Sequence, residues 1–85
     1  MLEQLLDQVV VLDMSSPFIF IGTLVEEGHR YLVLKDVDVH DLRDSSSTRE
    51  VYVHEVRTHG LAPNRKRVLV QKDRVVSLSR LSDVY

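Results

Sequence analysis

The spacing of apolar residues predicts a mainly β-structured domain that opens with a short helix. Leu2, Leu5 and Leu6 recur at helical spacing with no glycine or proline between them. The pattern then becomes strand-like in five runs of β-forming residues, at about 9–12, 18–25, 30–39, 68–70 and 75–78. A chain of 85 residues buries enough surface for one small core, so we expect a single domain, 1–85.

The second run is apolar on both faces, because side chains along a strand alternate in direction. Phe18, Phe20 and Leu24 would share one face of this strand. Ile19 and Ile21 would share the opposite face, so we expect both faces to be covered.

Two further details concern the shape of the sheet. We expect Gly22 at a sharp bend of the second strand, because a small barrel needs a residue without Cβ there. Simple alternation would put four residues of the third strand on one face: Tyr31, Val33, Val37 and Val39.

The stretch between the third and fourth strands predicts a helix at about residues 48–59. Ser47 and Glu50 have the spacing of a capping box, and Gly60 suits a C-terminal cap. A strand remains an alternative, because apolar and polar residues also alternate over 51–56.

Such a helix would have a narrow apolar face to bury. Val53 and Val56 fall along one stripe, and we expect them to pack against Ile19 and Ile21 or against a neighbouring subunit. The helix would expose a polar face made of Arg49, Glu50, Arg57 and Thr58.

Composition narrows the possible functions. The absence of cysteine removes disulfides, thiolate zinc sites and cysteine nucleophiles. Eleven basic against thirteen acidic residues give a net charge of −2, so any nucleic-acid binding must be local. The apolar runs are far shorter than the roughly 20 residues that cross a bilayer, and no signal-peptide pattern opens the chain. We therefore expect a cytoplasmic protein without a membrane partner.

Metal-ligating residue types are present but scattered. Asp36, Asp38 and His40 would share one strand face. His54 and His59 would lie on the expected helix. No recognised ligand spacing joins them, so we expect no metal and no other cofactor.

The residues also lack a pattern typical of an enzyme. The serines at 45–47 are near His40 and Asp44 in sequence, but no nucleophile elbow or oxyanion loop accompanies them. We interpret these serines as a turn and a helix cap, and we expect no catalytic activity.

Two segments resemble the sequence motifs of the Sm and Sm-like (LSm) RNA-binding proteins. Residues 10–36 are similar to the first motif through apolar alternation, the Gly22-Thr23-Leu24 triplet and the apolar run from Leu32 to Asp36. Residues 68–79 are similar to the second motif without a gap. The resemblance implies a divergent bacterial or phage-type member with the Sm-like fold. That fold is mostly β, with a short N-terminal helix and a five-stranded, strongly bent antiparallel barrel, here with a helix inserted between strands three and four.

The residues with which this family binds bases are replaced. The family uses an Asp, an Asn and a stacking side chain in the first motif, and an Arg-Gly pair in the second. Here His29 stands at the stacking position, Arg30 follows it and Tyr31 occupies the Asn position. Gln71 and Lys72 replace the Arg-Gly pair.

These replacements still allow stacking and phosphate contact without base-specific readout. The resemblance therefore implies six candidate nucleic-acid-binding residues: His29, Arg30, Tyr31, Gln71, Lys72 and Arg74. Glu27 or Gly28 stands opposite the family's Asp. The basic run at 65–67 could meet a phosphate backbone or form a solvated loop.

Two functions fit these observations. One is a homo-oligomeric Sm-like ring that binds RNA or another single-stranded nucleic acid through pore-side loops. In this family, strand four of one subunit pairs with strand five of the next. The other is an oligomeric scaffold that has lost nucleic-acid binding and engages a protein partner through the inserted helix. The loss of the family's Asn and Arg-Gly favours the scaffold, whereas His29, Tyr31 and Lys72 favour the ring that binds nucleic acid.

Overall fold

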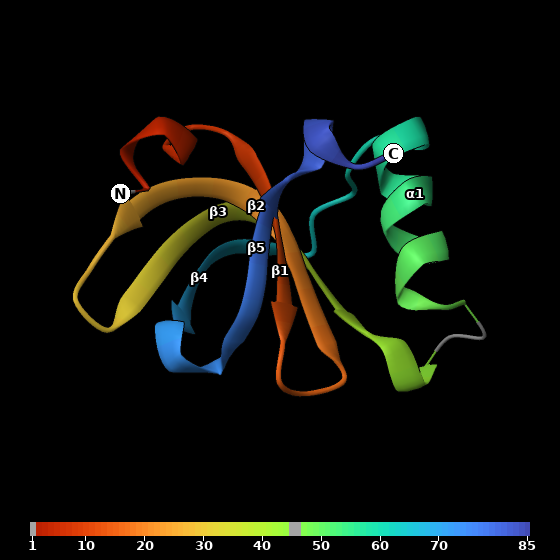
Figure 1. Cartoon of the computed structure of the whole chain (residues 1–85). Helices are drawn as coiled ribbons and strands as arrows, with labels where there is room; N and C mark the ends of the chain where they lie inside the picture. The colour runs from red at the N-terminus through yellow and green to blue at the C-terminus, as the bar shows by residue number, and fades with distance from the viewer. Residues whose placement is uncertain (1, 45–46) are drawn as a thin grey trace.

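The computed structural model describes residues 2–44 and 47–85, which form a five-stranded antiparallel sheet and one α-helix (Figure 1). The strands are β1 (Val9–Met14), β2 (Phe18–Glu27), β3 (Tyr31–Asp41), β4 (Arg65–Gln71) and β5 (Val75–Arg80). They lie in the order β4-β3-β2-β1-β5, so β4 and β5 are the edge strands. Helix α1 (Arg49–His59) is inserted between β3 and β4. This succession of elements confirms the predicted one.

The predicted short N-terminal helix is a single 3-10 turn, η1 (Glu3–Leu5). Leu6 ends it in an extended conformation, and Asp7 then takes a positive φ of 66° and donates its backbone N–H to Leu24 O at 2.7 Å. Leu2 and Leu5 nevertheless pack against the interior of the sheet. No helix in the described part of the chain is long and apolar enough to cross a membrane.

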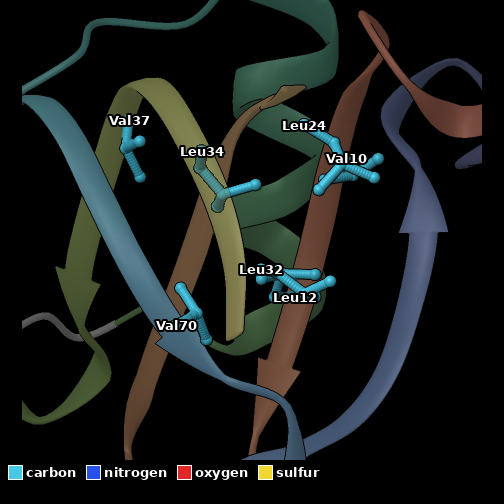
Figure 2. Close-up of a cluster of buried hydrophobic side chains, with 7 residues drawn as sticks. All are labelled: Val10, Leu12, Leu24, Leu32, Leu34, Val37 and Val70. Carbon is cyan, nitrogen blue, oxygen red and sulfur yellow. The ribbon is translucent and has the colours of Figure 1, made fainter. Parts of the chain in front are cut away.

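The sheet curls around one cluster of buried side chains, shown in Figure 2. The cluster joins β1, β2, β3 and β4: Val10, Leu12, Leu24, Leu32, Leu34, Val37 and Val70. Phe20 packs partly buried against it. Burial of each such aliphatic side chain stabilises the fold by at most about 1.5–3 kcal/mol, so this cluster is a main source of stability.

Asp36 interrupts the alternation of β3. Its φ is +50°, and the register between β2 and β3 shifts by one residue at this point. Val37 therefore faces the interior only three residues after the buried Leu34, whereas Tyr31 is 42% exposed. The single face predicted for 31–39 is wrong, because a bulge restarts the alternation.

Gly22 faces this bulge from β2. A Cβ at Gly22 would lie 2.9 Å from Val37 Cγ2 and 3.1 Å from Lys35 O. The predicted need for a residue without Cβ is confirmed, and its cause is the close approach of β3 to β2 at Gly22.

The insert is a helix, and the alternative of a strand is wrong. Thr48 caps it, with extended backbone angles and an Oγ1 that accepts a hydrogen bond from Val51 N at 3.2 Å. The cap is therefore one residue later than Ser47, the residue predicted from the capping-box spacing. Gly60 ends the helix at a φ of 95° and donates its N–H to Val56 O at 2.8 Å.

Helix α1 packs on the outer face of β2, as predicted, and on that of β1 (Figure 1). Val53 and Val56 are buried against Ile19 and Ile21 of β2 and against Val11 of β1. Both faces of β2 are therefore covered, one by the interior and the other by the inserted helix.

One residue of the predicted polar face does not belong to it. Arg49 Nη1 lies 2.9 Å from Asp13 Oδ1, and Asp13 Oδ2 accepts a hydrogen bond from Ser77 Oγ at 2.8 Å. This link ties the start of α1 to β1 and β5. The rest of the predicted polar face is exposed: Glu50, Arg57 and Thr58.

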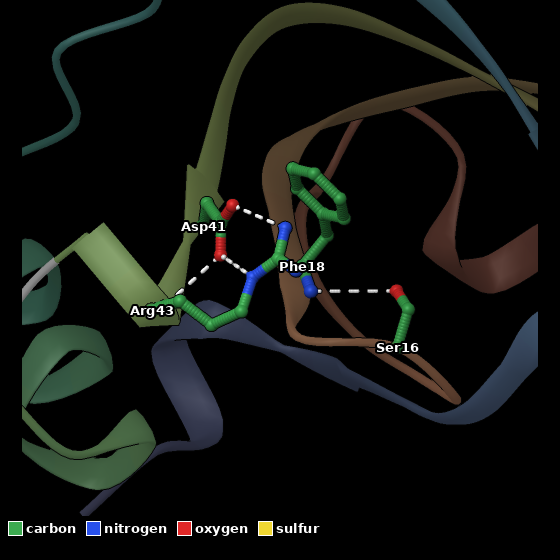
Figure 3. Close-up of polar contacts among 4 residues, drawn as sticks. All are labelled: Ser16, Phe18, Asp41 and Arg43. Carbon is green, nitrogen blue, oxygen red and sulfur yellow. Dashed lines mark hydrogen bonds and ion pairs between the residues drawn. The ribbon is translucent and has the colours of Figure 1, made fainter.

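Polar contacts fix the corner where β3 ends beside the β1–β2 turn (Figure 3). The Arg43 guanidinium binds the Asp41 carboxylate through Nε at 3.0 Å and through Nη2 at 2.8 Å. These hydrogen bonds lower the pKa of Asp41 to about 2. Arg43 also lies 5.9 Å from the centre of the Phe18 ring, and Ser16 Oγ accepts a hydrogen bond from Phe18 N at 3.3 Å. The corner is thus held before the chain leaves the sheet for α1.

Candidate nucleic-acid interface

Two chain reversals meet at one end of the β3–β4 ladder and form a pocket. One is the loop at 28–30 between β2 and β3, and the other is η3 (Lys72–Arg74) between β4 and β5. Lys72 N donates to Arg30 O at 2.9 Å, and Tyr31 lies directly opposite Gln71. The resulting open cavity has a volume of about 360 Å³ and is lined by His29, Arg30, Tyr31, Gln71, Lys72 and Asp73.

The structure brings five of the six predicted site residues into this pocket. The exception is Arg74, which lines a separate groove with Phe20 and Leu69 and accepts a hydrogen bond from Ser15 N at its backbone O. Asp73 was not among the predicted site residues. In the sequence it stands between two of them, Lys72 and Arg74, and this adjacency could have indicated it.

Lys72 is already bound within the protein. Its Nζ lies 2.7 Å from Glu27 Oε2 and 3.1 Å from Gly28 O. The hydrogen bond from Lys72 holds the pKa of Glu27 below its usual range. Glu27, which stands near the family's Asp position, thus neutralises Lys72 and joins β2 to η3.

Arg30, unlike Lys72, is a cation of the pocket whose charge is not neutralised by a carboxylate in the described residues. It is exposed, and none of the salt bridges within residues 2–44 and 47–85 involves it. A guanidinium can bind a phosphate through two N–H groups or stack on a base.

The stacking groups of the pocket are the rings of His29 and Tyr31. Tyr31 is the first residue of β3 and is 42% exposed, and His29 is exposed in the preceding loop. The β ladder holds the Tyr31 backbone opposite Gln71, whose amide lies in the same pocket. Two rings, an amide and a guanidinium can stack a base and meet a phosphate, but they provide no base-specific pattern.

The carboxylate and imidazole groups of β3 serve a structural purpose. Asp38 accepts hydrogen bonds from the Tyr52 hydroxyl and from Asn64 Nδ2, and His40 stacks on the Tyr52 ring at 4.0 Å. Burial raises the pKa of Asp38. Asp36 is the bulge residue and is exposed. Within the described residues no group of three or more His, Cys, Asp or Glu side chains is placed to hold a metal ion.

Two further sequence interpretations can be compared with the structure. The basic run at 65–67 is not a loop, because Arg65 begins β4 and Arg67 pairs with Lys35 of β3. Of the serines at 45–47, Ser45 and Ser46 lie outside the described residues.

Comparison with solved structures shows an Sm-like fold. The Sm protein of Pyrococcus abyssii, solved in complex with a uridine heptamer, aligns with a TM-score of 0.63 and 16% identity over 93% of this chain and 90% of that one. A chain of the NatC complex bound to CoA aligns with a TM-score of 0.63 and 17% identity over 94% of this chain and 83% of that one. A chain of the NatC complex bound to Gag peptide and CoA gives 0.61 and 18% over 92% and 87%.

No protein-family model matches the sequence, and a search of curated proteins gave no match. At identities of 16–18% the structural likeness shows the fold alone. It confirms the predicted class: a mostly β, strongly bent five-stranded antiparallel sheet with one helix and the Sm-like arrangement.

Proposed function

We propose that this protein is a ring-forming Sm-like protein that binds RNA or another single-stranded nucleic acid without uridine-specific readout. The binding site is the pocket between the 28–30 loop and η3. As a divergent family member, of bacterial or phage type, it would act in the cytoplasm and would not be an enzyme.

One observation carries this proposal. Two segments about 40 residues apart, 29–31 and 71–72, converge on one open pocket that combines two aromatic rings with a free guanidinium. Stacking surfaces beside a cation are what single-stranded nucleic acid needs when its sequence is not read. The Pyrococcus protein with its uridine heptamer adds that a protein of this fold can hold RNA.

Ring assembly is supported by the two edge strands. Leu69 on β4 is 59% exposed, and Val76 on β5 is 71% exposed. Leu69 also lines a groove of about 320 Å³ with the apolar side chains of Met14, Phe18 and Phe20. Pairing β4 of one subunit with β5 of the next would cover these side chains and leave no free edge once the ring closes.

An oligomeric protein-interaction scaffold is the second candidate, and α1 is the observation that favours it. The helix packs firmly on the sheet but leaves Glu50, Arg57 and Thr58 exposed as a second polar surface. Two of the similar structures are chains of a multi-protein assembly, the NatC complex. In this case the pocket would be an ordinary hairpin end and would not bind nucleic acid.

A salt-titrated binding assay with oligo-U, oligo-A and single-stranded DNA separates the two candidates. The protein's assembly size is first measured by light scattering. We expect all three strands to bind with similar affinity and to bind more weakly as salt rises, because phosphate contacts release counterions. Absence of binding at low salt by the assembled protein would favour the scaffold.

A further inference from the structure

The face of the β3–β4 ribbon that carries the pocket continues beyond it. Three directly opposed pairs follow one another on this face: Tyr31–Gln71, Val33–Leu69 and Lys35–Arg67. The residues between them point the other way, since Leu34 and Val70 are buried in the interior cluster. The middle pair, Val33–Leu69, is apolar, and the pair farthest from the pocket, Lys35–Arg67, is basic.

The basic pair is unusual for a sheet. Lys35 and Arg67 are both exposed and directly opposite each other, and like charges in this arrangement destabilise a strand pair. Arg65 and Lys66 add two more exposed cations on the same edge strand. In the part of the chain that the structure describes, none of these four forms a salt bridge.

A local arrangement that lowers stability is most often found where function requires it. An anion bound between Lys35 and Arg67 would remove their repulsion. Lys35 lies four strand residues from Tyr31, a distance of about 13 Å. An anion that contacts both the pocket and the basic pair must therefore be at least this long. A chain with phosphates at regular intervals can reach both places at once.

We propose that Lys35 and Arg67 bind the phosphate backbone of the same single strand whose base stacks on Tyr31. This rests on the proposed function of the pocket and extends its site along the outer face of β3 and β4. The outer face of these strands is thereby a track for several nucleotides, not only a pocket for one.

The test uses the double variant Lys35→Gln/Arg67→Gln and a control with the same change in net charge, Arg57→Glu on α1. Affinity for a labelled ten-nucleotide single-stranded RNA is measured by fluorescence anisotropy at several salt concentrations. Two lost phosphate contacts reduce the steepness of the salt dependence by about 1.4 and the affinity on the order of tenfold at physiological salt. The control keeps the steepness of wild type.

The thermal unfolding of the free protein distinguishes function from folding. We expect the double variant to melt at the same temperature as wild type or higher, because it removes repulsion between opposed cations. A lower melting temperature in the double variant and in both single variants would show that these cations stabilise the fold, and would overturn the proposal.

The binding results also separate this proposal from that of the pocket. Unchanged affinity and salt dependence in the double variant, with loss of binding in Tyr31→Ala, would overturn the track and keep the pocket. Loss in the double variant alone would keep the phosphate site and overturn the pocket. A decamer of glutamate that competes as well as RNA would show an acidic protein surface as the ligand of Lys35 and Arg67, and would overturn the track.

Discussion

The phenol of Tyr52 on α1 donates a hydrogen bond to the carboxylate of Asp38 on β3 and so fixes the inserted helix to the sheet. The Tyr52 ring also stacks on His40, with the ring planes 10° apart. Asn64, which follows the helix, binds Asp38 with its amide and exchanges two hydrogen bonds of 3.0 Å with the backbone of Val39. The insert is therefore attached to β3 both along the helix and at its return to β4.

Substitution of Tyr52 tests this attachment. Tyr52→Phe keeps the ring and its stacking on His40 but removes the hydroxyl that binds Asp38. We expect the free energy of unfolding, measured by urea denaturation, to fall by about 1–2 kcal/mol. Tyr31→Phe is the matched control, because Tyr31 is exposed at the end of a strand, and it should leave stability unchanged. Equal stability of both variants would show that the hydrogen bond contributes nothing.

The close approach of β2 and β3 predicts an ordered series at Gly22. An added Cβ would meet Val37 Cγ2 at 2.9 Å, so the strands must separate or the side chain must shift. We expect Gly22→Ala to lower the free energy of unfolding by about 1–3 kcal/mol and Gly22→Val to lower it more. A Gly22→Val protein with the stability of wild type would contradict the close contact.

The ion pair between Glu27 and Lys72 predicts that the pocket gains a cation when the pair is broken. At neutral pH the pair is intact, because the Lys72 hydrogen bond lowers the pKa of Glu27. The stability that the pair contributes is present at neutral pH and is lost as pH falls through this lowered pKa. Glu27→Gln should free Lys72 for phosphate, strengthen binding of single-stranded RNA and steepen its salt dependence by about 0.7.

Glu26→Gln is the control, because it removes the same charge from the neighbouring residue. Glu26 is exposed and forms no salt bridge within the described residues. It should bind RNA like wild type. Weaker binding by Glu27→Gln would mean that the ion pair is required to shape the loop at 28–30.

The exposed apolar side chains of the edge strands predict the effect of charge on assembly. Leu69→Lys and Val76→Lys should each reduce the particle mass measured by light scattering to that of a monomer, because a lysine on an edge opposes strand pairing. Val51→Lys is the control, since Val51 is also apolar and 47% exposed but lies on α1. A monomeric wild-type protein at micromolar concentration would contradict ring assembly.

The strands and the covered faces of β2 could be predicted from the sequence because they depend on local alternation. The side chains of Ile19 and Ile21 point to the opposite face of β2 from those of Phe20 and Leu24, whichever residues of the neighbouring strands pair with them. The bulge at Asp36 could not be predicted in this way. It depends on how β3 fits against Gly22 of β2, and no local pattern around Asp36 distinguishes it from a continuous strand.

The candidate site shows the same limit. Alignment with the family's motifs indicated His29, Tyr31 and Gln71 because they follow directly from the strand positions. The neutralisation of Lys72 by Glu27 joins residues 45 positions apart and exists only once β2, β3 and β4 lie together. The basic pair of Lys35 and Arg67 likewise depends on the register of β3 with β4.

Binding of a single-stranded oligonucleotide by wild type, Tyr31→Ala and Tyr85→Ala tests most directly whether the pocket holds nucleic acid. Tyr85 is a fully exposed tyrosine that does not line the pocket, so it controls for the loss of a ring. We expect Tyr31→Ala to weaken binding by about 1–3 kcal/mol, the value of one stacked base, and Tyr85→Ala to bind like wild type. Equal affinity of Tyr31→Ala and wild type, or wild-type binding that does not weaken as salt rises, would contradict a nucleic-acid site in this pocket.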